Sequence, residues 1–491
     1  MFTQYVVLFI YFIILFSIGI VASKRTKNIE DYYVGGKKLG YWVVAFSVRA
    51  TGESGWLLLG LTGLGAFAGV SAFWVVFGEV LGVAVAWFFM AKRFKRLSDK
   101  YNSITVPDFL VSHFNAKTNT LRIVAATALS LFVVIYVSAQ IDAIGSAFES
   151  FLNWDYYIGA LVGFAIVLLY IAYGGFLAVV WSDVFQGILM FFGLVLLPIY
   201  IYFTLDSGVD ILGSLTTIDP SLTNIWGGDG ASFYTIATIF GYAMIGIGFL
   251  GSPQLFVRFM AVKSEEEIDK GKWVAIVFTL LTDGAAVCIG LLGRYLFTTT
   301  GQDVEGVLGI NAQNVLPYIV ENMLPLIVSG VYIAVVLAAI MSTIDSLLVV
   351  ASSAITRDFY QQIVNPKVDS KKLSKISKKV TIVMAILALS IALIVAVSSP
   401  TRTIFWFIIF GWSGIAATFC PVIILLLFWK GYNEKGAIAS MITGFLSIPF
   451  FEFIAPNIPT VGIYFEQIAE MLPSFLMAMV IGVIVSKITK E

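Results

Sequence analysis

Hydroxyl and carboxyl side chains lie inside long apolar stretches of this 491-residue chain. In the stretch 325–355, Ser342, Asp345 and Ser346 recur at intervals of three and four residues, which puts them on one face of a helix. Clustered hard oxygen donors of this kind suit a small hard cation such as Na+. Hydroxyls in apolar helices often bond back to their own backbone, but Asp345 on the same face favours an ion site.

A second pair of polar groups is formed by Arg49 and Glu53, which are four residues apart and pair if the helix is intact between them. Inside the membrane each such residue costs about 2.5 to 3.5 kcal/mol even on a lenient insertion scale, so it needs a partner or a function. Six acids accompany Arg49 in the apolar stretches: Glu53, Glu79, Asp142, Asp183, Asp283 and Asp345.

One base against six acids favours a pathway for cations. Because burial favours the neutral form of a carboxyl group, proton coupling stays open as an alternative, with Glu53 or Asp345 as the carrier and Arg49 tuning it. We assign Arg49, Glu53, Glu79 and Asp142 to a network that couples charge to transport.

The composition identifies the elements that must position these groups. Apolar residues make up 59% of the chain and charged residues 12%, a balance that excludes a soluble enzyme. Apolar runs predict an all-α polytopic membrane protein with thirteen helices, near 4–22, 42–66, 70–91, 122–147, 157–178, 183–204, 232–257, 273–297, 325–355, 379–398, 403–429, 435–454 and 471–487.

Basic residues orient these helices. Of the 30 Lys and Arg residues, 27 fall in alternate connections or in the C-terminal tail, and short cytoplasmic loops carry such an excess. The N-terminus is therefore expected outside and the C-terminus inside, in the plasma membrane.

Two of the expected helices contain helix breakers at membrane depth. The second carries Gly52 and Gly55 beside its charges, and the seventh, five helices later, runs from Gly241 to Pro253 through Gly246, Gly248 and Gly251. Paired interruptions in two halves are typical of inverted-repeat transporters, in which unwound backbone binds ions and solute. Glycines that simply allow close helix packing are the alternative.

The sequence gives little support to catalysis, to a metal or cofactor site, or to nucleic-acid binding. The chain has a single histidine, His113, and its two cysteines, Cys288 and Cys420, lie in apolar runs. Neither a nucleophile–base pair nor a metal cluster is visible, so we expect no enzyme and no organic cofactor. The zero net charge gives no support to a nucleic-acid partner. A membrane sensor or channel would need an appended signalling domain or a symmetric pore, and no obligate protein partner is evident.

Several motifs together resemble the sodium:solute symporter family, and its sodium/proline symporters most. They are Ser54-Gly55-Trp56-Leu57-Leu58-Leu59-Gly60, Tyr173-Gly174-Gly175-Phe176-Leu177-Ala178-Val179 with Ser182-Asp183, Arg258-Phe259-Met260-Ala261, Ala338-Ala339-Ile340-Met341-Ser342-Thr343, and Ser352-Ser353-Ala354-Ile355-Thr356.

The resemblance implies one transmembrane domain over residues 1–491. An extra first helix and loop (1–41) precede a core of two inverted five-helix repeats (42–429), and two C-terminal helices (430–491) follow. It implies import of a small organic solute, driven by the Na+ gradient through alternating access. Proline or a related amino acid is the first expectation, and a carboxylate or a sugar is the alternative.

The resemblance also implies site residues. A Na+ site would use the backbone carbonyls of Ala50, Glu53 and Ala339 with the hydroxyls of Ser342 and Thr343. A second cation position would involve Asp183, Asp345, Ser342 and Ser346. The solute would contact Ser54, Gly55, Trp56, Tyr136, Gln140, Ile245 and Phe249.

The chain departs from the proline symporters at several of these positions. Gly52 stands where they carry an aspartate, and the acid is found one residue later, at Glu53. Ile245 and Phe249 stand where they carry Trp and Tyr. Arg49, Glu79, Asp142 and Asp345 are also not the usual residues. These departures concern the solute and the number of ions rather than the scaffold.

Overall fold

The regular elements are helical throughout the residues that the computed structural model describes, which are 2–25, 29–206, 208–228 and 230–490, with the side chains of 29, 170–174 and 370–371 left aside. Within these ranges no β-strand forms, and Leu39 and Val262 make one isolated bridge. The predicted all-α class is confirmed.

The longer helices form the body of the molecule. They are α1 (Phe2–Ser23), α3 (Tyr41–Gly52), α5 (Phe73–Val85), α8 (Thr120–Leu152), α9 (Tyr156–Thr204), α11 (Phe233–Ala243), α13 (Glu265–Phe297), α16 (Leu326–Ser353), α17 (Ser370–Ser398), α18 (Ile404–Phe428), α19 (Glu434–Pro449) and α21 (Met471–Ile488).

Short helices connect or extend them. These are α2 (Ile29–Val34), α4 (Thr62–Ala68), α6 (Ala91–Lys100), α7 (Val106–Phe114), α10 (Ile211–Ile218), α12 (Pro253–Ala261), α14 (Val304–Leu308), α15 (Val315–Met323) and α20 (Gly462–Ile468). Among the 3-10 and π-helical segments, η2 (Trp56–Leu61), η4 (Ala86–Met90), η6 (Met244–Leu250) and η8 (Ala354–Val364) continue longer helices, and η1 (Gly35–Lys37), η3 (Gly69–Ala72), η5 (Pro220–Thr223), η7 (Ile310–Ala312), η9 (Phe450–Ile454) and η10 (Ala455–Asn457) are short turns.

Eleven helical runs among the described residues are long and apolar enough to cross a membrane, judged by length and composition. The expected spans 157–178 and 183–204 share the label α9, but they form two helical segments that meet in a kink at Gly175, where φ is 61° and ψ is −172°. The run Trp56–Lys100 likewise contains parts of two expected spans, which separate at Gly69 with φ 67°. The protein is therefore a multi-pass membrane protein, while the count of thirteen and the N-out orientation remain predictions.

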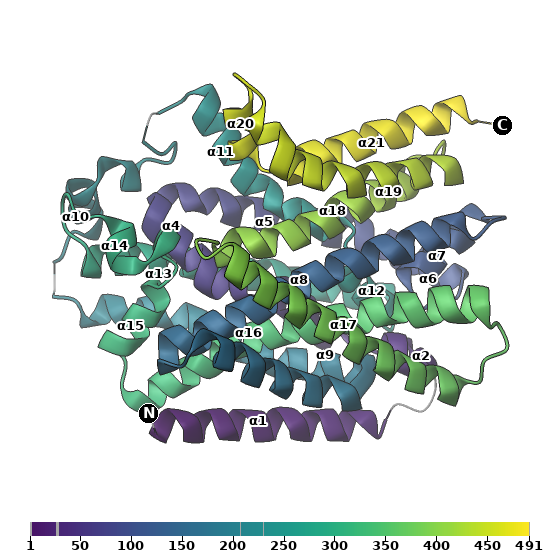
Figure 1. Cartoon of the computed structure of the whole chain (residues 1–491), viewed down its shortest axis with the longest axis horizontal. Coiled ribbons are helices and arrows are strands. Elements are labelled where there is room, and N and C mark those ends of the chain that lie inside the picture. Colours follow the sequence, from purple (N-terminus) through teal and green to yellow (C-terminus); the bar gives the residue numbers. More distant parts are fainter. Residues whose placement is uncertain (1, 26–28, 207, 229, 491) are drawn as a thin grey trace.

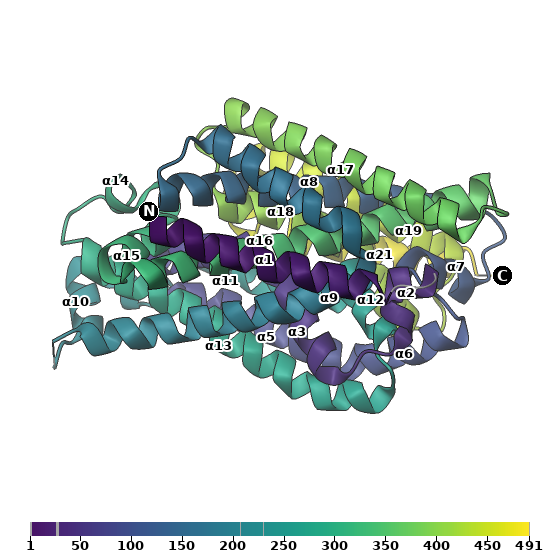
Figure 2. The same cartoon turned by 90° about the horizontal axis from the view of Figure 1, so that it is seen from below.

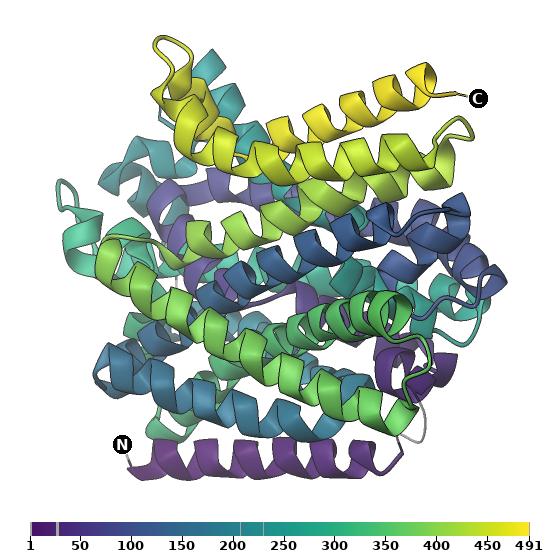
Figure 3. The ribbon, with the colours of Figure 1, turned by 45° about the vertical axis from the view of Figure 1, so that its right-hand side comes forward.

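Most of the long helices lie roughly along one direction across the bundle (Figure 1). In Figures 1 and 3, α1 follows one edge, and α19 and α21 follow the opposite edge. Figure 2 shows α1 crossing in front of α16 and α9, on which it packs. The helix α16 lies between these edges and is buried throughout its most apolar stretch. Any site built on α16 is therefore enclosed by protein rather than by lipid.

Glycines allow α5 to touch the interrupted segment η6. A Cβ atom added at Gly78 would lie 1.8 Å from the carbonyl oxygen of Ala243, and one added at Gly246 would lie 2.0 Å from that of Gly78. These distances are far below van der Waals contact, so only glycine permits this backbone-to-backbone packing. Close packing, the alternative explanation of these glycines, therefore applies to Gly246, which also lies in the interrupted segment.

We expect Gly78→Ala to lower the thermal stability of the detergent-solubilised protein, because the new methyl group would push α5 away from η6. Overpacking of this kind costs about 1 to 3 kcal/mol or more. Gly284→Ala is the matched control, since a Cβ atom at Gly284 on α13 would have no neighbour within 4 Å. Equal melting temperatures for the two variants would contradict the close contact.

Candidate functional site

The break in the second expected span begins where α3 ends at Gly52. Glu53 is extended, with φ −80° and ψ 135°, and helical geometry resumes only at Gly55. The carbonyl groups of the last turn of a helix have no partner further along the same helix. The Gly55 amide donates a hydrogen bond to Oε1 of Gln140 on α8, at 3.2 Å. Gln140 therefore holds the interrupted segment in place, and the last carbonyl groups of α3 remain available to partners on other helices.

The free carbonyls of α3 meet two hydroxyls of α16. Ser342 donates to the carbonyl of Ala50 at 2.8 Å and to that of Ala339 at 3.0 Å. Thr343 donates to the carbonyl of Glu53 at 3.0 Å and to that of Ala339 at 3.2 Å. The five residues expected at the Na+ site therefore lie together, with their oxygen atoms converging between α3 and α16.

The chemistry of this group is that of neutral oxygen ligands. All its members are carbonyls or hydroxyls, and they are buried. Among the described residues, no group of three or more His, Cys, Asp or Glu side chains is placed to hold a metal ion. Neutral hard oxygens without added charge fit a monovalent hard cation better than a divalent or soft one.

Asp183 and Ser346, expected at a second cation position, are joined by the guanidinium of Arg258 on α12. Nη2 of Arg258 donates to Asp183 at 2.8 Å and to Ser346 at 2.6 Å. Ser47 on α3 donates to the same Asp183 oxygen at 2.6 Å and accepts from Nε of Arg258 at 2.6 Å. A positive charge of the protein itself thus lies between these two residues, and it links α3, α9, α12 and α16.

Asp345 and Ser342 complete the residues expected at that position. Oδ1 of Asp345 accepts a hydrogen bond from the amide of Ser346 at 2.8 Å. Ser342 faces the carbonyl group of Ala50, as described above. The hydroxyl of Thr51 on α3 connects the two regions, because it lies 2.9 Å from the Ser346 hydroxyl.

The expected pair of Arg49 and Glu53 is present, with both side chains fully buried. Asp283 on α13 lies 3.9 Å from Nη2 of Arg49, and Thr282 donates to Asp283 at 3.1 Å. Glu79 on α5, which is also buried, lies within electrostatic range of Arg49 and Glu53. Arg49, Glu53 and Glu79 of the expected charge network are therefore brought together, and Asp283 joins them.

Asp142, the fourth member expected in that network, lies in a different cluster. It accepts hydrogen bonds from Arg402 and, at 2.5 Å, from the hydroxyl of Tyr156 on α9. The guanidinium of Arg402 also lies over the Tyr156 ring, 5.3 Å from its centre. Arg402 precedes α18, so this cluster ties that end of α18 to α8 and α9.

The expected solute residues surround the two interrupted segments. Gln140 donates to the Ser54 hydroxyl at 3.1 Å, and the Trp56 indole donates to the carbonyl of Gly52 at 3.1 Å. Phe249 on η6 and Tyr136 on α8 each pack against Trp412 of α18, with ring centres 5.3 and 6.3 Å apart.

Trp412 is the residue of this group that sequence reasoning missed. Its indole donates to the carbonyl of Ile245 at 2.9 Å, so it satisfies the broken backbone of η6. In the sequence, Trp412 lies between Gly411 and Gly414 in an apolar run, and this setting does not distinguish it from a packing residue.

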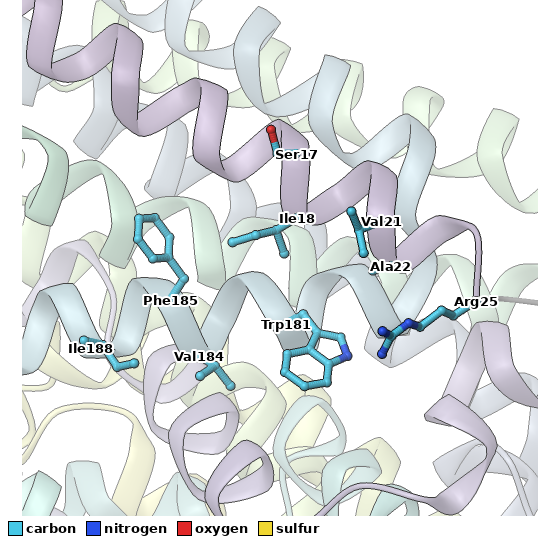
Figure 4. A pocket seen from close by; sticks show the side chains of 9 residues that line it. All are labelled: Ser17, Ile18, Val21, Ala22, Arg25, Trp181, Val184, Phe185 and Ile188. Atoms are coloured by element: carbon cyan, nitrogen blue, oxygen red, sulfur yellow. The ribbon is translucent and has the colours of Figure 1, made fainter.

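A groove of about 520 Å³ lies elsewhere, between α1 and α9 (Figure 4). Its lining is mostly apolar, with Trp181 and Phe185 on α9, and Arg25 stands at one end. None of the residues that line the groove belongs to the candidate site, so the groove is no part of that site.

A family model confirms the resemblance deduced from the motifs. The model of the sodium:solute symporter family matches residues 32–444 of this chain. The chain belongs to the sodium:solute symporter family. It is accordingly a solute symporter and not an enzyme, and its place is the plasma membrane.

Curated members of the family align along almost the whole length. The chain is 34% identical to the high-affinity proline transporter PutP of Bacillus subtilis (strain 168), over 93% of this chain and 96% of the relative. It is 31% identical to a sodium/proline symporter of Staphylococcus aureus, over 99% and 93% of the two chains.

A solved structure of a Na+-coupled sialic acid symporter has the same fold. It superposes with a TM-score of 0.80 at 21% identity, covering 100% of this chain and 98% of the other. This likeness confirms the fold of the chain.

We expect Asp183→Asn to lower the free energy of unfolding, because Arg258 would keep its charge in a buried place without a carboxylate. Breaking a buried ion pair at one partner costs about 3 to 5 kcal/mol. Glu265→Gln, which breaks the exposed pair with Arg96, is the control and should change the melting temperature little. Similar melting temperatures for the two variants would contradict the role of Asp183 as partner of Arg258.

Proposed function

We propose that this symporter imports proline or a closely related amino acid together with Na+. Relatives named as proline transporters align over more than nine tenths of the chain. The single observation that carries the proposal is the convergence of the Ala50, Glu53 and Ala339 carbonyls on the Ser342 and Thr343 hydroxyls. We assign these five residues to the Na+ site.

The proposed mechanism depends on the interruption of α3. A Na+ ion between α3 and α16 would replace the hydroxyl-to-carbonyl hydrogen bonds by ion–oxygen contacts and would hold residues 53–55 in one arrangement. Ser54 and Gly55 belong to this segment and Trp56 directly follows it, so the ion would also position the residues that we assign to the solute. Differential binding of this kind shifts the population between conformations.

Linkage makes this coupling reciprocal. If Na+ raises the affinity for the solute by some factor, the solute raises the affinity for Na+ by the same factor. Solute-binding titrations at several Na+ concentrations, and Na+ titrations at several solute concentrations, measure both factors in one purified preparation. Independent affinities would contradict symport through this site.

Uptake of radiolabelled proline into proteoliposomes tests the function directly. We expect accumulation under an inward Na+ gradient at equal pH on both sides, and none under a proton gradient without Na+. Accumulation under the proton gradient alone would favour the proton-coupled alternative, with Glu53 or Asp345 as carrier. Competition by carboxylates or sugars, in place of amino acids, would overturn proline as the solute.

Replacing the two site hydroxyls should remove the Na+ dependence. We expect Ser342→Ala with Thr343→Ala to abolish Na+-stimulated uptake, because two of the five oxygens are lost. Ser353→Ala on the same helix is the control, since that hydroxyl bonds its own backbone at Val350. Unchanged Na+ stimulation in the double variant would remove these hydroxyls from the ion site.

A further inference from the structure

Two nitrogen atoms of the Arg49 side chain have no hydrogen-bond partner among the described residues. The side chain is fully buried, and Nη2 pairs with Glu53. Nε and Nη1 make no hydrogen bond to any residue that the structure describes. A guanidinium carries five N–H donors and cannot lose its charge in a protein, and an unpaired donor in a buried place costs free energy. These donors therefore need an acceptor that the described chain does not supply.

The unpaired side of the guanidinium faces the interruption. Its central carbon lies 4.8 Å from the centre of the Phe249 ring on η6. A Cβ atom at Gly52 would lie 2.9 Å from that ring and 3.8 Å from Nη1 of Arg49. Gly52 has no side chain, and its carbonyl is bound to Trp56, so nothing of Gly52 itself satisfies Nη1. Arg49 thus stands among the residues that we assign to the solute.

Charge identifies the kind of acceptor. The acids around Arg49 are Glu53 at the end of its own helix, Asp283 on α13 and Glu79 on α5. Asp283 lies beside Nη2, the nitrogen that already pairs with Glu53. A solute that carries one negative and one positive charge adds no net charge to this group, and its amino group finds carboxyl groups nearby.

We propose that Arg49 binds the carboxylate of the transported amino acid through Nη1, and that it selects solutes with this group. The inference rests on the proposed function and names the residue that recognises the solute. A hydrogen bond from a guanidinium to a carboxylate has a charge on both partners, so it is stronger than a hydrogen bond to the neutral oxygen of an amide. Arg49 therefore has two partners: Glu53 accepts from Nη2 and holds the side chain in place, and the solute accepts from Nη1.

The test compares acids with their amides. Purified protein in saturating Na+ is titrated with proline and prolinamide, and with alanine and alaninamide, and the melting temperature reports binding. We expect the wild type to favour each acid over its amide by about 10- to 100-fold, the range of a hydrogen bond to a charged group. This ratio should fall to about one when Arg49 is replaced by Gln.

The variants separate recognition from folding. Arg49→Gln alone leaves Glu53 and Asp283 without their cation, so Arg49→Gln is also made in the Glu53→Gln background, with Glu53→Gln alone as the matched control. The ratio measured in Glu53→Gln is the reference for this comparison, and the double variant should fall below it to about one. Arg49→Lys keeps the charge but offers one compact ammonium group in place of separate nitrogens for Glu53 and the solute, so its ratio should lie between the two.

Each outcome decides something different. A double variant that prefers acids as strongly as Glu53→Gln overturns the role of Arg49 and leaves proline import standing. A wild type that binds alanine but not proline, with a ratio that collapses in the double variant, supports the role of Arg49 and overturns proline as the solute. A wild type that prefers amides or binds neither amino acid overturns both.

Discussion

A backbone carbonyl within a membrane needs a partner inside the protein, because lipid offers no hydrogen bond. The interruption of α3 after Gly52 creates several such carbonyls near the middle of the bundle, and the position of α16 satisfies them. Ser342 and Thr343 are the side chains that reach them. The arrangement explains why α16 is buried along its most apolar stretch, and why hydroxyls rather than apolar groups occupy these positions. A site that binds an ion by exchanging hydrogen bonds for ion contacts follows from the same constraint.

Three arginines tie different helices of the bundle together. Arg402 joins the start of α18 to Asp142 of α8, Arg49 joins α3 to α13, and Arg258 joins α12 to α9 and α16. A buried ion pair contributes little net stability compared with apolar packing, but losing one partner is expensive. Such pairs therefore favour particular arrangements of helices, which suits a protein that alternates between conformations. The short contacts around Gly78 and Gly246 hold α5 and η6 against each other by packing alone.

The periodic and compositional features of the sequence predicted most of the scaffold. Apolar length predicted the helices, and the glycines of 52–55 and 241–253 predicted both interruptions, because these signals are local. The boundaries were less accurate where helices continue beyond the apolar run, as in α6 and η8, and the break inside α9 falls at Gly175 rather than after residue 178. The sequence shows Arg258 only as part of a motif and does not predict its partners, because nothing in the spacing links residue 258 to residues 47, 183 and 346.

The sequence by itself determined that this chain spans a membrane, that its second and seventh helices break, and that hard oxygen donors and buried charges accompany the breaks. These properties depend on neighbours within a few residues and on the preference of each residue for lipid or water. Only the tertiary structure decided which charges meet: Asp142 pairs with Arg402 rather than with the Arg49 group, Trp412 caps the broken backbone of η6, and Arg258 stands between Asp183 and Ser346. Contacts between helices depend on how the whole bundle packs, and that packing is not encoded in the spacing of any one segment.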